Sequence, residues 1–117
     1  LKERKVRIII TSDHGTVRVQ NPSKIIGDKA TTTNLRYKTG RNLNFNEKEV
    51  FYIKNPEEAF LPKSNLSSSY VFAKEDYYFC YPNNYNHFVN YYRNTFQHGG
   101  VSIEEVIVPV AVFESKN

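Results

Sequence analysis

An apolar, β-branched run near the start of the chain ends in a polar turn, and this feature constrains the fold more than any other. Residues 6–10 are apolar except for Arg7, and polar residues flank the run on both sides. Strands that are covered on both faces of an α/β sheet have this pattern, whereas a half-exposed strand alternates. We therefore expect a buried central strand in an α/β fold. The polar residues 11–15 (TSDHG) follow at its carboxyl end, where open α/β sheets carry functional residues.

Length and composition exclude several classes of protein. The chain has 117 residues, of which 24% are charged and 39% hydrophobic, as expected for one globular domain rather than a disordered chain. Its apolar runs are far shorter than the roughly 20 residues of a membrane span. The single cysteine, Cys80, excludes an internal disulfide and zinc sites built from two or more cysteines, and its strand context favours core packing. We expect a cytoplasmic protein without membrane insertion.

The remaining pattern predicts strands that alternate with short helices. Residues 20–46 are polar and are expected to form a long loop. Periodic aromatic residues predict a helix over 85–95, and Pro56 and the capping box Ser102–Glu105 each mark the start of a short helix. Strands are expected at residues 6–10, 16–19, 47–54, 69–73, 77–81 and 106–113, with 69–73 and 77–81 forming a hairpin and the last strand buried.

Positive charge is concentrated in the first third of the chain. Residues 1–41 contain ten Lys and Arg against three Asp and Glu, a net charge of +7, whereas residues 42–117 carry −3. Such a field attracts phosphates, nucleic acid or anionic surfaces, whereas for any single basic residue an ordinary solvated surface is the favoured interpretation. No helix-turn-helix or zinc-finger pattern indicates duplex DNA binding.

Two motifs contain candidate metal ligands. Asp13-His14-Gly15 follows the first strand, and His98 precedes two glycines that permit close approach to a ligand. One Asp and two His favour zinc or manganese, as a mononuclear site or as part of a two-metal site. The alternatives are a structural turn with a capping histidine and a helix end beside a surface histidine. His87, in a Tyr-rich segment, is expected to pack or to make a polar surface contact.

The same motifs give the chain a family resemblance. The segments ITSDHG at residues 10–15 and FQHGGVSIEEVIVPV at residues 96–110 resemble the two closing motifs of the PglZ domain, a branch of the alkaline phosphatase superfamily. The segments SKIIGDKATTTNLRYKTGRNLN and FAKEDYYFCYPNNYNHFVNYYRNTFQHGG resemble the PglZ domain of PorX-type response regulators, which accompany the type IX secretion system of Bacteroidetes. The resemblance covers essentially the whole chain, and the pairing of SDHG with a later HGG-x-S-x-E-E is specific.

This resemblance implies a two-zinc phosphoester hydrolase on an α/β/α core. In the superfamily an Asp-His pair at a strand end binds one zinc and a later His binds the other; Asp13, His14 and His98 match these ligands. The nucleophilic Thr or Ser and the other ligands precede the Asp-His pair, and no residue before Asp13 fits. The resemblance therefore implies that residues 1–117 are the C-terminal part of a single PglZ domain, without the upstream part, its nucleophile or a receiver domain, and are inactive alone.

The resemblance also implies a substrate, a context and partners. PorX-type members are associated with phosphodiesterase action on linear and cyclic oligonucleotides, with dimerisation, and with contacts to a sensor kinase, the secretion system and a sigma factor. A basic loop beside the metal site would attract a polyanionic substrate. Candidate substrate-binding residues are Lys29, Arg36, Lys38, Arg41 and His87.

Two other functions stay open at this point. The phosphatase fold can persist as a non-catalytic regulatory or protein-interaction module, which the presence or absence of the nucleophile would decide. The basic first third can instead bind nucleic acid without hydrolysing it, which a steep salt dependence without turnover would indicate.

Overall fold

The structure is a computed structural model that describes residues 3–28, 33–63 and 66–116. It is mixed α/β, as the sequence predicts, and its strands form small sheets. The elements follow one another as β1 (Arg7–Thr11), β2 (Val17–Arg18), β3 (Asn21–Lys24), β4 (Tyr37–Gly40), η1 (Glu47–Glu49), β5 (Val50–Ile53), η2 (Pro56–Ala59), β6 (Ser69–Ala73), β7 (Tyr77–Cys80), α1 (Tyr85–Tyr92), β8 (Phe96–Gln97), α2 (Ile103–Val106) and β9 (Val110–Glu114).

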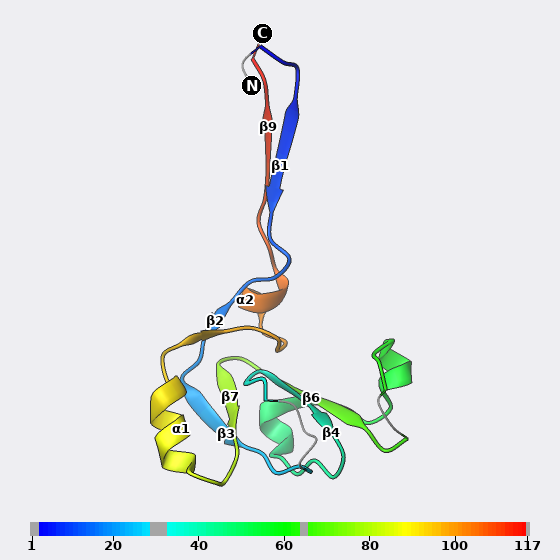
Figure 1. Ribbon diagram of the computed structural model, residues 1–117, viewed down its shortest axis with the longest axis vertical. Helices are drawn as coiled ribbons and strands as arrows, with labels where there is room; N and C mark the ends of the chain where they lie inside the picture. Colours follow the sequence, from blue (N-terminus) through cyan, green and yellow to red (C-terminus); the bar gives the residue numbers. More distant parts are fainter. Residues whose placement is uncertain (1–2, 29–32, 64–65, 117) are drawn as a thin grey trace.

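The molecule has two parts, a projecting ribbon and a body. The ribbon consists of β1 and β9, which pair antiparallel from Arg7 opposite Glu114 to Thr11 opposite Val110. The body contains the other elements, and α2 lies where the ribbon joins it (Figure 1). The ribbon gives the molecule its elongated shape, with extents of 60 × 34 × 23 Å.

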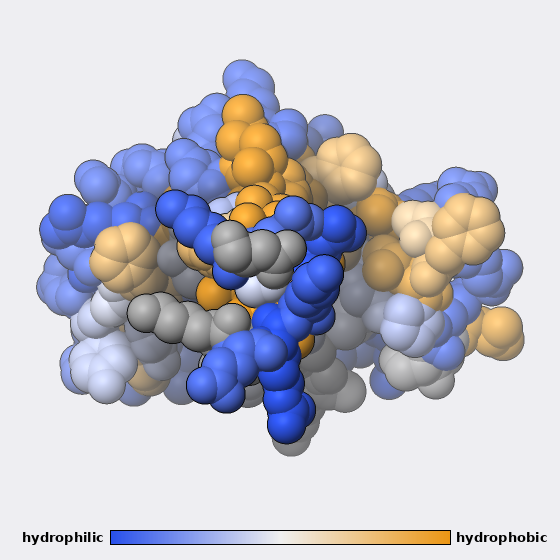
Figure 2. All heavy atoms as spheres, turned by 90° about the horizontal axis from the view of Figure 1, so that it is seen from above, coloured by the Kyte–Doolittle hydropathy of each residue, from blue (hydrophilic) through white to orange (hydrophobic). Residues whose placement is uncertain are grey.

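The ribbon corrects one expectation. Its two strands lie close to where the sequence predicts them, but they are exposed: Ile9 is 61% and Val112 is 55% accessible. Only one edge of each strand is paired, and the described residues place no helix on either face, so apolar side chains remain in contact with solvent. Viewed toward the tip of the ribbon, apolar side chains gather in a central band between hydrophilic ones (Figure 2).

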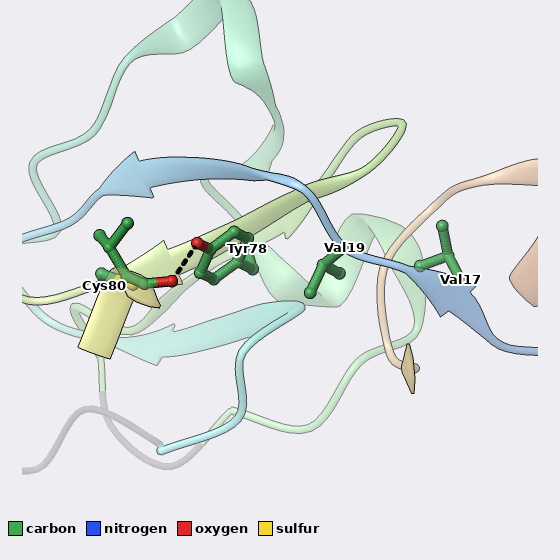
Figure 3. Packing of buried hydrophobic residues seen from close by; sticks show 5 residues of the cluster. Val17, Val19, Tyr78 and Cys80 are labelled. Atoms are coloured by element: carbon green, nitrogen blue, oxygen red, sulfur yellow. Dashed lines mark hydrogen bonds between the residues drawn. The ribbon is translucent and has the colours of Figure 1, made fainter. Parts of the chain in front are cut away.

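Among the described residues, two apolar clusters stabilise the body, one on each face of β7. Because successive side chains of a strand point to opposite faces, Tyr78 and Cys80 enter one cluster while Phe79 enters the other. The first cluster also contains Val17, Val19 and Val89, and the second contains Ile25, Val50, Val71 and Ala73. The Tyr78 hydroxyl donates a hydrogen bond to the Val89 carbonyl of α1 at 2.6 Å (Figure 3).

Cys80 is buried in the first cluster, which confirms the prediction of core packing. Burial raises the pKa of its thiol to about 11, despite the nearby Lys38 ammonium. The thiol is therefore protonated at neutral pH and chemically inert.

The sheets of the body correct two further expectations. The expected long loop over residues 20–46 contains β3 and β4. β3 (NPSK) lacks apolar alternation, and it pairs in parallel with β7 as an edge strand, where Pro22 is tolerated. The expected hairpin is wrong because β4 and β5 occupy both edges of β6, so that β7 turns away to pair with β3.

The sequence predicted where the helices begin more accurately than it predicted how the strands pair. η2 begins at Pro56, and α2 carries the predicted capping box of Ser102 and Glu105. α1 ends at Tyr92, earlier than expected, because Arg93 and Asn94 leave the helical conformation. In the part of the chain that is described, we find no helix with the length and hydrophobicity that crossing a membrane requires.

Candidate metal centre

The two histidine-bearing motifs meet where the ribbon joins the body. Asp13 and His14 lie between β1 and β2, and His98 lies between β8 and α2. Because β2 and β8 pair antiparallel, with Val17 opposite Gln97, the segment that enters β2 runs beside the segment that leaves β8. The rings of His14 and His98 stack with their centroids 3.8 Å apart and their planes 14° from parallel. The fold thus brings together candidate ligands that are distant in sequence.

Asp13 and His14 present their polar atoms to one another at this junction. Oδ1 of Asp13 lies 3.5 Å from Nε2 of His14, and the Asp13 side chain is open to solvent. Nδ1 of His14 lies 2.8 Å from the carbonyl oxygen of Gly15. In the tautomer whose Nδ1–H donates to this carbonyl, Nε2 keeps its lone pair, which is how proteins commonly orient a histidine ligand. The Asp13 carboxylate and the His14 Nε2 can therefore share a cation.

The Asp13-His14 turn rests directly on α2. The Gly15 N–H donates to the carbonyl oxygen of Glu105 at 2.8 Å. A Cβ atom added to Gly15 would lie only 1.8 Å from the carbonyl oxygen of Glu104. Any side chain at this position would push the turn away from α2, so the close approach requires glycine.

The segment after His98 is held by the side chain of Glu105, which is 4% exposed. Arg36 donates to it from Nε to Oε1 at 2.8 Å and from Nη2 to Oε2 at 2.7 Å. The Gly100 N–H donates to Oε1 at 2.9 Å, and the N–H and hydroxyl of Ser102 donate to Oε2 at 2.9 and 2.7 Å. Burial raises the pKa of this carboxyl, but the hydrogen bonds from Arg36, Ser102 and Gly100 outweigh it and hold the pKa at about 2.

The donor set fits part of a zinc site. Asp and His are ligands that zinc accepts, but in residues 3–28, 33–63 and 66–116 no group of three or more His, Cys, Asp or Glu is placed to hold one ion. The stacked rings of His14 and His98 direct their in-plane lone pairs along neighbouring, nearly parallel planes instead of toward one point.

The described candidate substrate-binding residues are not brought together at this junction as His14 and His98 are. Arg36 is fully buried in its ion pair with Glu105, so its guanidinium lies inside the protein instead of on the expected rim. Arg41 is half-exposed, 3.5 Å from Asp28, and His87 is exposed on α1, where its ring contacts Phe88. Lys29 lies outside the described residues.

Lys38, the remaining candidate, is almost completely buried. Its ammonium lies 4.7 Å from the centre of the Tyr81 ring, and it lines a cavity of about 400 Å³ with Phe79, Phe88 and Tyr92. Burial lowers the pKa of Lys38 to about 8, so the residue is still mainly protonated at neutral pH.

The sequence pattern missed the tertiary role of Glu105. The Ser-x-x-Glu spacing identifies Glu105 as half of a capping box, and the structure confirms that local role. The spacing does not predict that Glu105 pairs with Arg36, because Arg36 belongs to a distant segment that was expected to be a loop. Arg36 is basic like its neighbours Lys38 and Arg41, so composition alone could not single it out.

Comparison with known proteins agrees with the two motifs. The sequence model of the BREX system PglZ alkaline phosphatase-like domain matches residues 2–113, which include all three candidate ligands and the Glu105–Arg36 pair. No curated protein matches the chain. Because the family match spans nearly the whole sequence, the chain belongs to the PglZ family of alkaline phosphatase-like domains.

Proposed function

We propose that this chain supplies part of the metal-ligand set of a two-zinc phosphodiesterase that hydrolyses linear or cyclic oligonucleotides. The observation that carries the proposal is the contact between His14 and His98, whose rings stack at 3.8 Å although their motifs lie at opposite ends of the chain. Membership of an alkaline phosphatase-like family supports a phosphoester substrate.

In this proposal Asp13 and His14 hold one zinc ion and His98 holds the other. Bound zinc would supply charge neutralisation at the phosphate and acidify the nucleophile. The chain's own residues orient the ligands: the Gly15 carbonyl accepts from Nδ1 of His14 and leaves Nε2 as the donor atom. The nucleophile and the remaining ligands come from residues outside 1–117, in an upstream part of the same domain, and residues 1–117 alone are expected to be inactive.

The basic first third of the chain supports an anionic substrate. Residues 1–41 carry a net charge of +7 and contain the Asp13-His14 turn. A positive field raises the local concentration of a polyanion. Arg41, which is half-exposed and lies 3.5 Å from Asp28, is one described candidate for a contact with a phosphate. Lys29, Lys38 and His87 stay candidates within the same proposal, whereas the guanidinium of Arg36 is buried against Glu105.

The cellular context proposed here rests on sequence resemblance. The segments around residues 23–44 and 72–100 resemble PorX-type response regulators, which implies a cytoplasmic protein that controls type IX secretion. A homodimer, a sensor kinase, the secretion system and a sigma factor are the partners that follow from it. Phosphorylation-dependent dimerisation of the full-length protein, measured by light scattering, tests this context separately from the chemistry.

The phosphodiesterase proposal is tested in the full-length protein with Asp13→Ala and His98→Ala. Both variants should lose bound zinc, measured by elemental analysis, and most hydrolysis of a cyclic dinucleotide. Glu58→Ala removes an exposed carboxylate on η2 and should retain zinc and activity. Unchanged zinc content in both ligand variants would contradict the proposal. If the wild-type protein binds its partners but neither zinc nor substrate, the fold serves as a regulatory module.

A further inference from the structure

We propose that the buried Glu105–Arg36 pair positions the two histidine-bearing loops against each other and so sets the geometry of the metal site. The inference rests on the proposed function, since it assigns a role toward the same site. Neither residue is a metal ligand here. Both act through the backbone segments that contain Asp13-His14 and His98, so they are positioning residues.

The first loop is attached to the backbone of Glu105. The Gly15 N–H bonds to the Glu105 carbonyl, and the absence of a Cβ atom on Gly15 lets the turn lie against the carbonyl of Glu104. His14 is the residue before this contact, and its Nδ1 bonds to the Gly15 carbonyl. A displacement of Glu105 therefore moves the anchor of the His14 ring.

The second loop is attached to the side chain of the same residue. One carboxylate oxygen of Glu105 accepts the Gly100 N–H, and the other accepts the N–H and hydroxyl of Ser102. Gly100 also fits tightly, because an added Cβ would lie 2.6 Å from Nη2 of Arg36 and 2.7 Å from the Ala73 carbonyl oxygen. His98 lies two residues before Gly100, so one glutamate holds both ligand loops.

Arg36 fixes the orientation of that glutamate relative to the body. Its two hydrogen bonds to the carboxylate are bidentate, a geometry that restricts rotation as well as distance. Nη1 of Arg36 also donates to the carbonyl oxygens of Lys74, at 3.3 Å, and Tyr77. The Arg36 carbonyl in turn accepts the Ala73 N–H at 2.8 Å. The pair thereby connects the metal loops to the strands that carry the core.

A purely stabilising role would not need charges at this place. A buried ion pair contributes little net stability compared with apolar side chains of similar volume, because both charges lose their hydration. The pair instead fixes the orientation of the attached loops, because several hydrogen bonds converge on one carboxylate. Interactions that orient metal ligands from behind typically change metal affinity by about 10- to 100-fold when they are removed.

The test uses Glu105→Gln in the full-length protein, because glutamine keeps the size and one acceptor oxygen but loses the bidentate pair. We expect zinc to bind about 10- to 100-fold more weakly, by competition with a chelator. The visible absorption of Co²⁺ bound in place of zinc, which depends on ligand geometry, should also change. Ile25→Ala destabilises the core without touching the pair, and should leave both readouts at their wild-type values.

The outcomes separate the inference from the proposed function. If the wild-type protein binds neither zinc nor Co²⁺, the proposed function fails. If it binds both, and Glu105→Gln has the same affinity and spectrum, only the positioning role is overturned. If Glu105→Gln does not fold, Ser102→Ala decides, since it removes a single donor to the carboxylate. Weaker zinc binding with an altered spectrum supports the inference, and unchanged readouts overturn it.

Discussion

The strands of the ribbon and of the body contain similar residues, but they bury these residues to different extents. β1 (RIIIT) and β9 (VAVFE) are as rich in β-branched and aromatic residues as β6 (SYVFA) and β7 (YYFC). Yet Ile9 of the ribbon is 61% exposed, whereas Val71 of β6 is completely buried. Within the described residues, the strands of the body have paired edges and side chains packed against their faces, whereas each ribbon strand pairs only with the other. Burial thus follows from the packing partners and not from the strand pattern itself.

The largest expected effect concerns the charged pairs of the two regions. Arg36→Met leaves Glu105 buried without its cation and should lower the free energy of unfolding by about 3–5 kcal/mol. Arg7→Met breaks the exposed Arg7–Glu114 pair of the ribbon, with N···O at 2.6 Å, and should cost at most about 1 kcal/mol. Urea denaturation of both variants measures the difference. Equal losses would mean that the two pairs have similar surroundings.

An identical substitution compares the apolar side chains directly. Ile25→Ala removes a completely buried side chain from the body and should cost about 2–5 kcal/mol. Ile9→Ala in the ribbon should cost less than about 1 kcal/mol, because the side chain already contacts water. Thermal denaturation, with urea denaturation as a second probe, tests this order. A loss at Ile9 as large as that at Ile25 would show that the ribbon is covered in solution.

The stability that the buried Glu105 carboxylate contributes should depend on pH. The folded pKa of Glu105 is about 2, below its ordinary value of 4.5, so its contribution to stability is present above pH 4.5 and is lost as the pH falls toward 2. The size of this contribution is about 3 kcal/mol. The stability difference between wild type and Glu105→Gln should be largest above pH 5 and should close toward pH 2. A difference that does not depend on pH would contradict this assignment.

Local patterns predicted much of the element list. Apolar runs located β1, β6 and β7, aromatic spacing located α1, and capping signals located η2 and α2, because each depends on residues near in sequence. Pairing was harder to predict. β3 has no apolar alternation, and the edges that β4 and β5 occupy on β6 cannot be inferred from residues 69–81 alone.

In the candidate site too, local motifs predicted some features and tertiary contacts determined the others. Asp13, His14 and His98 were predicted from their motifs, and the pairing of β2 with β8 brings His14 and His98 into contact. Arg36 was expected at a substrate rim, but Glu105 holds it in the interior. A motif can identify a candidate ligand, whereas the partner of a buried charge depends on tertiary contacts that join distant segments.

The smallest expected effect compares two hydroxyl groups that each donate to a carbonyl. Tyr78→Phe removes a completely buried hydrogen bond to Val89 and should cost about 1 kcal/mol, because the Val89 carbonyl cannot exchange that partner for water. Thr11→Val removes the exposed 2.8 Å bond to Pro109 at the base of the ribbon, where water can replace the hydroxyl, so its cost should stay below about 0.5 kcal/mol. Parallel urea titrations resolve the two values. If Thr11→Val costs as much as Tyr78→Phe, the base of the ribbon is as well shielded from water as the core, and the contrast between the two regions does not hold there.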